Sequence, residues 1–366
     1  MKILLLITGL EVGGAERQVV DIADGLCRSG HSVKICYLAG KGLVRPESAE
    51  IEIIGLNVTK NIGGFLRAYF TLRKTIQEFR PDVVHSHMIH ANIMAIMVRF
   101  SVRIPRIISS VHTNNVGGKL RILACRTTGL LSDITTNVSE AAVEAYEAKG
   151  AIRRGAMVVV ANGIDTVRFS PNITARLMIR RNMDVADTSR VILAVGRFNE
   201  AKDYPNLLHA YKALRANGSA AQLWIAGDGE LRDELIELAE QLALNNHIRF
   251  LGVQNNVSDW LNAADVFVLS SAWEGFALVV GEAMACEKVV VATNAGGVSE
   301  VLGDCGFLVP TGDSHALSLS LRDALKLPEN EASELGRRAR ERVVENFSIV
   351  DKVNLWLGLY GKLKGK

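Results

Sequence analysis

The feature that most constrains the fold is a regular alternation of short apolar runs with longer amphipathic stretches. Runs rich in β-branched residues recur through the first half of the chain, at 2–7, 32–38, 51–54, 82–85, 106–110 and 134–138. A second series follows after a break, at 191–195, 222–226, 248–251, 266–269, 289–292 and 307–309. Such alternation is typical of βαβ units around a parallel sheet, so the sequence predicts two doubly wound α/β domains.

The break between the two series lies at Asn162-Gly163-Ile164-Asp165, where Asn-Gly favours a turn and the periodicity lapses. A chain of 366 residues also exceeds the length at which one hydrophobic core stops growing. We therefore expect one Rossmann-like domain over residues 1–164 and a second over 165–346. The remaining segment, 347–366, has the apolar pattern of a terminal helix up to Leu363, with Trp356 inside it.

The cysteines and the N-terminus indicate a cellular compartment. Five cysteines are scattered without any Cys-x-x-Cys pair, which argues against a disulfide framework and a structural zinc site and favours a reducing compartment. The first apolar run is only about eight residues long and ends in a Gly-rich loop, so we interpret it as a buried strand rather than a signal peptide. No run approaches the roughly 20 apolar residues of a spanning helix. We expect a cytoplasmic protein.

The net charge of +3 conceals an asymmetry, because residues 1–165 carry +6 and the remainder −3. The basic excess lies among apolar residues in two segments, at Arg67, Arg73, Lys74, Arg80, Arg99, Arg103, Arg106, Lys119, Arg121 and Arg126. This mixture suits an anionic membrane surface or an anionic acceptor. The alternative is that these are ordinary solvated helix faces. Nucleic acid is not an expected partner, because no recognisable binding module accompanies the charge.

Candidate binding residues are those directly after each apolar run, because ligands of open α/β sheets bind beyond the carboxyl ends of the strands. Gly13 and Gly14 follow the first run and would let the backbone approach a diphosphate at a helix start; a tight turn that needs glycine is the alternative. Arg197 and Lys202 follow a strand of the second half and could flank a diphosphate, although exposed basic pairs are common. The chain has no Gly-x-Gly-x-x-Gly and no P-loop, which disfavours NAD binding and P-loop hydrolysis.

The most informative segment is 264–285, in which a buried strand runs into a loop with Glu274 and then into a helix. The helix is predicted to start near Phe276 and to carry Glu282, so both carboxylates could face one ligand. Free N–H groups at its start, on residues 276–278, would suit a phosphate. The alternative is a pair of surface glutamates. We expect no metal, because the chain has no Asp-x-Asp dyad.

His85, His87 and His90 cluster around a strand end. Two histidines two residues apart could share a metal, but only Asp82 is close in sequence as a carboxylate partner. Structural hydrogen bonding or contact with an acceptor fits their position better. His112, just past another strand end, is a candidate ligand contact, although a lone histidine is more often structural.

Taken in order, these motifs resemble the family 4 group of retaining GT-B glycosyltransferases, also called glycosyl transferases group 1. The hallmark of that group, Glu-x7-Glu, corresponds to Glu274 and Glu282. The likeness spans nearly the whole chain. Its other motifs are the loop at 13–16, the crossing at 160–165, Gly196-Arg197 with Lys202, residues 226–229, and Gly296-Gly297 before Glu300.

The resemblance implies a GT-B fold of two facing Rossmann-like domains, with the acceptor on 1–164, the nucleotide sugar on 165–346, and a helix in 347–366 that returns to the first domain. An ordinary terminal helix on the second domain is the alternative. By resemblance, Arg197 and Lys202 hold the donor diphosphate, Glu274 contacts sugar hydroxyls near the reacting centre, and Glu282 bonds the ribose. His112 would lie at the C6 side of the sugar. The remaining donor-binding positions are Gly13, Gly14, Val253, Gly275, Phe276, Ala277 and Leu278.

The function implied is retaining transfer of a hexose or N-acetylhexosamine from a UDP- or GDP-sugar, without cofactor or metal. The expected acceptor is a hydroxyl of a lipid-linked glycan in bacterial surface-polysaccharide assembly (O-antigen, capsule or lipopolysaccharide), with peripheral contact at the inner face of the membrane. Two alternatives stay open. One is a GT-B-type sugar-nucleotide epimerase, which needs no acceptor, and the other is a non-catalytic scaffold that binds nucleotide sugars.

Overall fold

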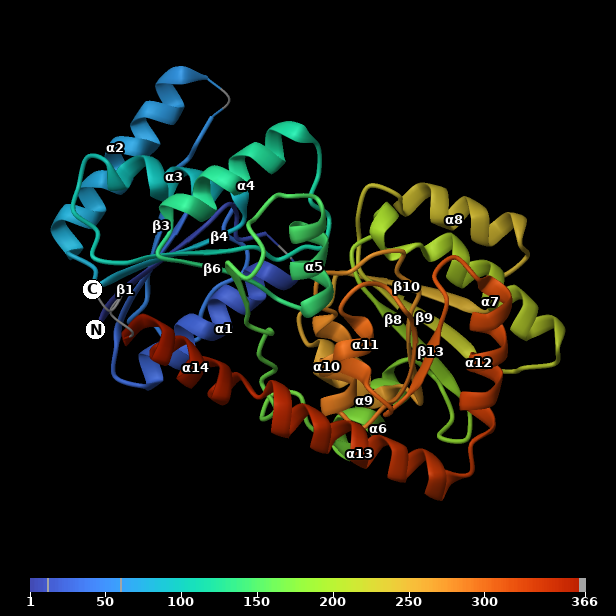
Figure 1. Ribbon diagram of the computed structural model, residues 1–366. Coiled ribbons are helices and arrows are strands. Elements are labelled where there is room, and N and C mark those ends of the chain that lie inside the picture. Colours follow the sequence, from blue (N-terminus) through green and yellow to red (C-terminus); the bar gives the residue numbers. More distant parts are fainter. Residues whose placement is uncertain (12, 60, 362–366) are drawn as a thin grey trace. The chain divides into compact units, whose positions relative to one another are not determined.

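The computed structural model describes residues 1–11, 13–59 and 61–361 and contains two α/β units (Figure 1). Unit 1 comprises Met1–Gly163 together with the chain from Ile349 onward, and unit 2 comprises Ile164–Ser348. Each unit is built around a parallel sheet with helices on both faces. The prediction of two doubly wound α/β folds is therefore confirmed.

The sheet of unit 1 has the strand order β3-β2-β1-β4-β5-β6-β7, and all its pairings are parallel. Its strands are β1 (Lys2–Ile7), β2 (Ser32–Tyr37), β3 (Glu52–Gly55), β4 (Val83–His87), β5 (Ile107–Ser110), β6 (Ile134–Asn137) and β7 (Met157–Val159). The order reverses at β1, which has β2 on one side and β4 on the other. Open α/β sheets bind ligands beyond the carboxyl ends of the strands at such a reversal.

The central strand of unit 1 is buried on both faces. Ile3, Leu5 and Ile7 of β1 pack against α1 (Gly14–Arg28) and α14 (Ile349–Gly361). The alternate residues Leu4 and Leu6 pack on the other face, against α2 (Ile62–Phe79) and α3 (Ile89–Arg99). This two-residue period is the geometry of a strand. The two remaining helices of the described part of unit 1 are α4 (Lys119–Leu131) and α5 (Glu140–Ala148).

The C-terminal helix α14 is part of unit 1, where it lies against α1. Gly25 makes this approach possible, because a Cβ at that position would lie 2.5 Å from a methyl group of Val353. At the other end of α14, the guanidinium of Arg106 donates to the carbonyls of Leu359 and Tyr360. A cation that bonds the last carbonyls stabilises a helix end. Residues 362–366, which the sequence analysis included in this segment, lie outside the described part of the chain.

The sheet of unit 2 has the order β10-β9-β8-β11-β12-β13 and is also parallel. Its strands are β8 (Val191–Val195), β9 (Gln222–Ala226), β10 (Ile248–Gly252), β11 (Val266–Leu269), β12 (Val289–Thr293) and β13 (Phe307–Val309). The order reverses at β8, between β9 and β11. The loops that follow β8, β9, β10 and β11 are therefore the ones that can surround a ligand.

Nine helical segments belong to unit 2, all within its described residues. They are α6 (Ile173–Asn182), the 3-10 turn η1 (Glu200–Lys202), α7 (Tyr204–Ala216), α8 (Arg232–Gln241), α9 (Val257–Ala263), α10 (Leu278–Ala285), α11 (Val298–Leu302), α12 (Ser314–Lys326) and α13 (Glu329–Phe347). The apolar sides of α7 and α12 pack on β8, β9, β11 and β12 and form much of the core of this unit.

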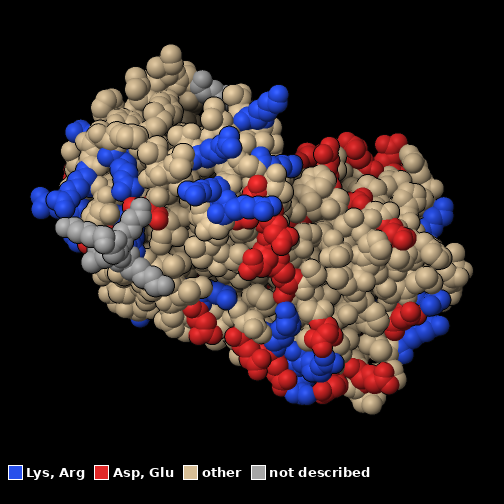
Figure 2. Space-filling view, in the orientation of Figure 1, with Lys and Arg blue, Asp and Glu red and all other residues tan. Residues whose placement is uncertain are grey.

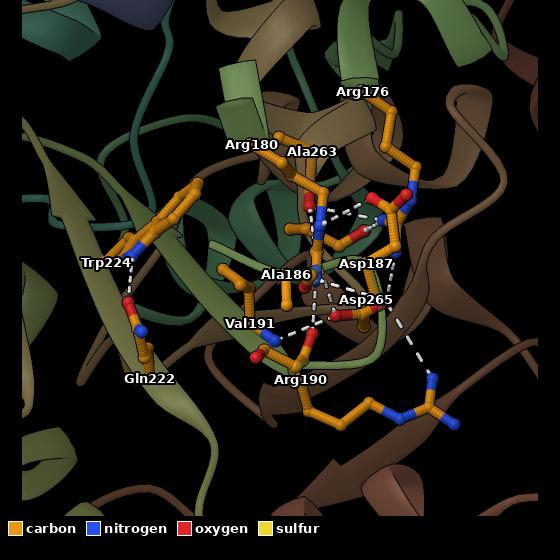
Figure 3. A network of polar contacts seen from close by, with 12 residues as sticks. Arg176, Arg180, Ala186, Asp187, Arg190, Val191, Gln222, Trp224, Ala263 and Asp265 are labelled. Carbon is orange, nitrogen blue, oxygen red and sulfur yellow. Dashed lines mark hydrogen bonds and ion pairs between the residues drawn. The ribbon is translucent and has the colours of Figure 1, made fainter. Parts of the chain in front are cut away.

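A buried polar network ties α6 to the amino ends of β8 and β11 (Figure 3). The carboxylate of Asp265 accepts from the backbone N–H of Val191 at 2.8 Å and from Arg176 at 2.8 Å. It also accepts from Arg180, whose side chain is only 1% exposed, at 3.4 Å. A buried cation needs such partners because it has lost its water. The network holds the edge of the sheet opposite to the candidate ligand edge, so its role is structural.

Candidate functional site

The loops at the carboxyl edge of the unit 2 sheet are joined by backbone hydrogen bonds. The N–H of Gly196 donates to Ala226 at 3.0 Å, and the N–H of Gly227 donates to Gly252 at 2.8 Å. Gly227 has φ of +145°, and a Cβ there would overlap the carbonyl oxygen of Gly196. Only glycine fits this position. The loops after β8, β9 and β10 therefore form one continuous backbone surface.

Lys202 and Glu274 meet at this edge as a partly buried ion pair. Their side chains are 20% and 13% exposed, and Lys202 Nζ lies 2.5 Å from Glu274 Oε1. The hydroxyl of Ser271 donates to the same carboxylate oxygen at 2.7 Å. On the backbone side, the hydroxyl of Ser270 donates to the carbonyl of Lys202 at 2.8 Å. The sequence singled out Lys202 and Glu274 separately, and the structure brings them together at the ends of β8 and β11.

Tyr204, which the sequence analysis missed, completes this cluster. Its buried hydroxyl donates to the carbonyl of Gly196 at 3.1 Å. Burial, and after it the charge of Glu274, raise the pKa of Tyr204 above its usual value, so the hydroxyl stays a neutral donor. A Cβ at Gly196 would lie 3.1 Å from the Lys202 side chain and 3.2 Å from this hydroxyl. The absence of that Cβ leaves Lys202 room to reach Glu274.

Arg197 forms a separate ion pair, with Glu230. Its side chain is 64% exposed and bonds through Nε to Glu230, itself 55% exposed, at 3.2 Å. Exposed ion pairs contribute only about 0–1 kcal/mol, so a bound anion could readily replace Glu230. The structure thus gives Arg197 and Lys202 different partners, one at the surface and one partly buried.

The segment from Glu274 to Glu282 differs in one detail from its prediction. Helix α10 begins at Leu278, with Ala277 as its N-cap, rather than near Phe276. The N–H of Leu278 donates to the carbonyl of Phe276 at 3.0 Å, so the prediction that this N–H is free is wrong. This hydrogen bond closes a tight turn just before the helix, so the N–H of Leu278 already has a partner. Glu282 lies one turn into α10 and is half-buried.

The position predicted to border a nucleotide base is open to solvent. Val253 directly follows β10 and is 51% exposed. Gly252 before it has φ of +67° and no atom within 4 Å of an added Cβ. The carbonyl of Gly252 accepts from Gly227, so this corner adjoins the loop after β9.

In unit 1 the two predicted glycines start α1. Gly13 is the N-cap residue, with extended backbone, and a Cβ there would overlap the carboxylate of Glu16. Gly14 is the first helical residue and is exposed. The Glu16 side chain can swing away, so this contact alone does not require glycine at position 13, and Gly14 presents open backbone at a helix start.

The histidines of unit 1 fall into separate roles. His85 is fully buried in β4 and bonds Tyr360 of α14 at 2.8 Å and Ser110 of β5 at 2.7 Å. It is therefore a structural link between the sheet and α14. His90 is exposed on α3. In the part of the chain that the structure describes, no group of three or more His, Cys, Asp or Glu side chains is arranged to hold a metal ion.

His112 and His87 form a pair of neutral rings. Nε2 of His112 lies 3.0 Å from Nδ1 of His87, which ends β4 and is fully buried. Burial lowers the pKa of His112 to about 4 and lowers the pKa of His87 well below its usual value. Both rings are therefore uncharged at neutral pH and can exchange hydrogen bonds without carrying charge.

Comparison with known proteins places two family domains on the chain. Residues 12–168 match the family model of Glycosyltransferase Family 4, and residues 176–342 match that of Glycosyl transferases group 1. The two matches follow one another and cover most of the chain.

Two bacterial relatives share moderate identity with the chain. The GalNAc-alpha-(1->4)-GalNAc-alpha-(1->3)-diNAcBac-PP-undecaprenol alpha-1,4-N-acetyl-D-galactosaminyltransferase of Campylobacter jejuni is 27% identical over 376 residues, which cover 100% of this chain and 99% of that protein. The N-acetyl-alpha-D-glucosaminyl L-malate synthase of Bacillus anthracis is 30% identical over 191 residues, or 51% of this chain. That match spans about half of the relative, 49% of its length.

The fold matches solved structures over nearly its whole length. Alr3699/HepE of Anabaena, solved in complex with UDP and glucose, superimposes with a TM-score of 0.87 at 21% identity. The match covers 99% of this chain and 100% of that one. The architecture is thus that of the GT-B glycosyltransferases.

Proposed function

Since the chain belongs to the glycosyltransferases, with a family 4 domain followed by a group 1 domain, we propose that it transfers a hexose or N-acetylhexosamine from a UDP- or GDP-sugar with retention of anomeric configuration. The observation that carries this proposal is the Lys202–Glu274 pair at the carboxyl edge of the unit 2 sheet. A cation held there suits a diphosphate, and a carboxylate held there suits sugar hydroxyls.

In this proposal unit 2 binds the donor. Lys202, Arg197 and the start of α10 lie where negative charge develops on the leaving diphosphate, and they stabilise it by preorganised electrostatics. Lys202 and Ser271 fix one oxygen of Glu274, which orients the carboxylate toward the sugar. Glu282 bonds the ribose. Retention follows from front-face attack by the acceptor hydroxyl, assisted by the leaving phosphate.

The proposed acceptor is a hydroxyl of a lipid-linked glycan, held by unit 1, in the assembly of a bacterial surface polysaccharide such as O-antigen, capsule or lipopolysaccharide. The Campylobacter relative supports this choice, because it matches over the full length and its name includes an undecaprenol-linked glycan.

The test is transfer of radiolabelled sugar from UDP-glucose, UDP-galactose, UDP-N-acetylglucosamine and GDP-mannose to undecaprenyl-diphosphate-linked glycan. We expect incorporation from one donor and its loss in Lys202→Ala. Conversion of the donor to its epimer without acceptor would instead favour the epimerase alternative. Donor binding without either reaction would favour the scaffold.

We also propose that unit 1 contacts the inner face of the cytoplasmic membrane. Helix α2 exposes Ile62, Leu66 and Phe70, which are four residues apart and therefore share one stripe. Helix α4 exposes Leu120 and Leu123 and contains no acidic residue. Lys and Arg side chains gather over α4, whereas Asp and Glu gather over α8 of unit 2 (Figure 2).

Hydrogen bonds link the three helices of this surface, α2, α3 and α4, to one another. The hydroxyl of Tyr69 on α2 donates to Ser101 after α3 at 2.7 Å, and Arg99 on α3 donates to the carbonyl of Leu131 on α4 at 3.0 Å. Apolar side chains among cations are typical of helices that lie on anionic lipid. None of the described helices is both long and apolar enough to cross a membrane.

Sedimentation with vesicles tests the membrane contact. We expect the protein to bind phosphatidylglycerol-containing vesicles, less at high salt, and Leu66→Glu with Phe70→Glu to abolish binding. Ile173→Glu with Leu177→Glu on α6 is the matched control, because those side chains are 67% and 49% exposed against 46% and 57% for Leu66 and Phe70. Equal loss in both double variants, or equal binding to neutral phosphatidylcholine vesicles, would reject the surface.

A further inference from the structure

Trp273 lies in the loop that carries Glu274, between β11 and α10. Of residues 270–277, all of which the structure describes, Trp273 is the one exposed residue, at 38%. Its neighbours Ser271 and Phe276 are 0% and 7% exposed. The indole is the largest apolar side chain of this loop and has the most to gain from burial. Its exposure beside Glu274 therefore points to a role outside the core.

Hydrogen bonds fix the backbone around Trp273 from two sides. The N–H of Ala272 donates to the carbonyl of Ala201 in η1 at 2.8 Å. The hydroxyl of Thr293, at the end of β12, donates to the carbonyl of Ser271 at 2.6 Å. The loop is thus tied to the chain after β8 and to β12, the two strands that flank β11. A rigid aromatic side chain on a fixed backbone loses little entropy when it meets a ligand.

The other two tryptophans of unit 2 have structural contacts that Trp273 lacks. Trp224 and Trp260 are 0% and 8% exposed, and their rings meet edge to face at 5.7 Å. Their Nε1 atoms donate to Gln222 at 3.2 Å (Figure 3) and to Gln254 at 3.0 Å. No ring contact or hydrogen bond joins the indole of Trp273 to another residue that the structure describes. Its exposed face and its N–H are therefore available to a ligand.

The place of Trp273 in the sheet indicates which part of a nucleotide sugar it can reach. In the strand order, β8 and β9 separate β11 from β10, so the corner at Val253 lies about 14 Å away across the sheet. A nucleobase at that corner is beyond the reach of this indole. Glu274, by contrast, is its neighbour in the chain, and Lys202 and Ser271 both bond Oε1 of Glu274, which leaves Oε2. A carboxylate oxygen and an open indole are suited to a sugar.

We propose that the indole of Trp273 stacks on a pyranose ring at the carboxyl edge of the unit 2 sheet. The proposal rests on the proposed function and adds an aromatic contact to it. The negative face of the indole attracts the C–H groups that a pyranose presents on its apolar face. The ring belongs either to the donor sugar or to the acceptor sugar that receives it. Both present the same C–H groups, and the experiment distinguishes them.

The fluorescence of Trp273 can be observed almost alone. The chain has four tryptophans, and the other three are at most 8% exposed. Acrylamide quenching of the wild type, compared with Trp273→Phe, therefore reports mainly on this indole. If the donor sugar covers it, one of UDP-glucose, UDP-galactose, UDP-N-acetylglucosamine and GDP-mannose should lower the quenching constant, whereas UDP and GDP should not. If the acceptor sugar covers it, protection should require undecaprenyl-diphosphate-linked glycan together with UDP or GDP.

Kinetics with three variants separate stacking from a structural role. Trp273→Ala should raise the KM of the substrate that carries the pyranose about tenfold and keep kcat within about twofold, because stacking is made equally before and at the transition state. Trp273→Phe keeps an aromatic ring, so its KM should stay within about threefold of the wild type. Leu308→Ala on β13 is the matched control, because Leu308 is also 38% exposed. Its KM and kcat should not change.

The contact and the proposed function fail separately. Equal quenching in all ligand states would overturn the stacking contact, and so would protection by UDP or GDP alone as strong as by the nucleotide sugars. An active wild type whose KM values are unchanged in Trp273→Ala would overturn it as well. If the wild type transfers sugar from none of the four donors, the proposed function fails. The quenching measurement then still decides whether Trp273 meets a sugar, because binding does not require turnover.

Discussion

A double-mutant cycle on Lys202 and Glu274 should yield a coupling of about 1–3 kcal/mol in the free energy of unfolding of unit 2. The range follows from burial, since the two side chains are 20% and 13% exposed. Exposed pairs contribute about 0–1 kcal/mol, and removing one partner of a fully buried pair costs about 3–5 kcal/mol. This pair lies between the two cases. Lys202→Met and Glu274→Gln remove the charges while keeping much of the packing.

The chain offers a matched control in Arg197 and Glu230, which are 64% and 55% exposed. Their coupling should stay below about 0.5 kcal/mol. Thermal unfolding of the single and double variants measures both cycles. Unit 2 spans residues 164–348, and for a unit of that size 1 kcal/mol shifts the melting temperature by about 2–4 °C. The Lys202–Glu274 coupling should therefore appear as about 2–12 °C.

High salt should separate the two coupling energies further, because dissolved ions screen exposed charges more than partly buried ones. In 1 M NaCl the control coupling should vanish while most of the Lys202–Glu274 coupling remains. Equal couplings in the two cycles, or a Lys202–Glu274 coupling below about 0.5 kcal/mol, would refute the argument that burial strengthens this pair.

Three further predictions concern stability. Asp265→Ala should lower the free energy of unfolding of unit 2 by about 3–5 kcal/mol, because the buried charge of Arg180 would keep only the exposed Asp187 as a carboxylate partner; urea unfolding measures this, and a loss under 1 kcal/mol would contradict it. Gly227→Ala should lower the melting temperature, because its Cβ would overlap the carbonyl of Gly196; an unchanged melting curve would show that the loop can move. Unit 1 should lose stability as the pH falls from about 6.5 towards 4, because the unfolded chain protonates His112 before the folded chain does. Protonation of His112 contributes up to about 3 kcal/mol to this loss of stability. If His112 is its source, the free energy of unfolding of His112→Asn, measured in urea, should depend less on pH than that of the wild type.

The fold class could be predicted because the apolar runs are short, regularly spaced and buried on both faces. The runs at 191–195 and 222–226 coincide with β8 and β9. Strand β7 was not predicted, because its short run leads directly into residues 160–165, where the sequence analysis placed the break between the two series. Strand β13 is equally short and also lies at a sheet edge, but its run at 307–309 stands clear of such a break and was predicted.

The contacts of the site could not be predicted, because they depend on how strands pair. Lys202 and Glu274 are 72 residues apart and meet because β8 and β11 are neighbours. Tyr204 was missed because a tyrosine at a helix start carries no signal of its buried bond to Gly196. The turn that occupies the N–H of Leu278 depends on local dihedral angles that the residue types do not specify.

The hydrogen bond between His87 and His112 could not be predicted for the same reason. The register of β4 and β5 sets His87 opposite Ser110, and His112 follows two residues later. Each histidine could be placed near a strand end from sequence alone. Their mutual bond required the strand order and the register.

The central claim is that unit 2 binds a nucleoside diphosphate, and thermal stabilisation tests it most directly. The melting temperature would be measured with UDP, GDP, UDP-glucose and GDP-mannose at millimolar concentration, for the wild type, Lys202→Ala and Glu282→Ala. A ligand at 100 times its Kd stabilises by about 2.7 kcal/mol, which corresponds to about 5–11 °C for a unit of this size. We predict such a shift with UDP or GDP and its loss in both variants. No shift of the wild type with any of the four nucleotides would contradict the account.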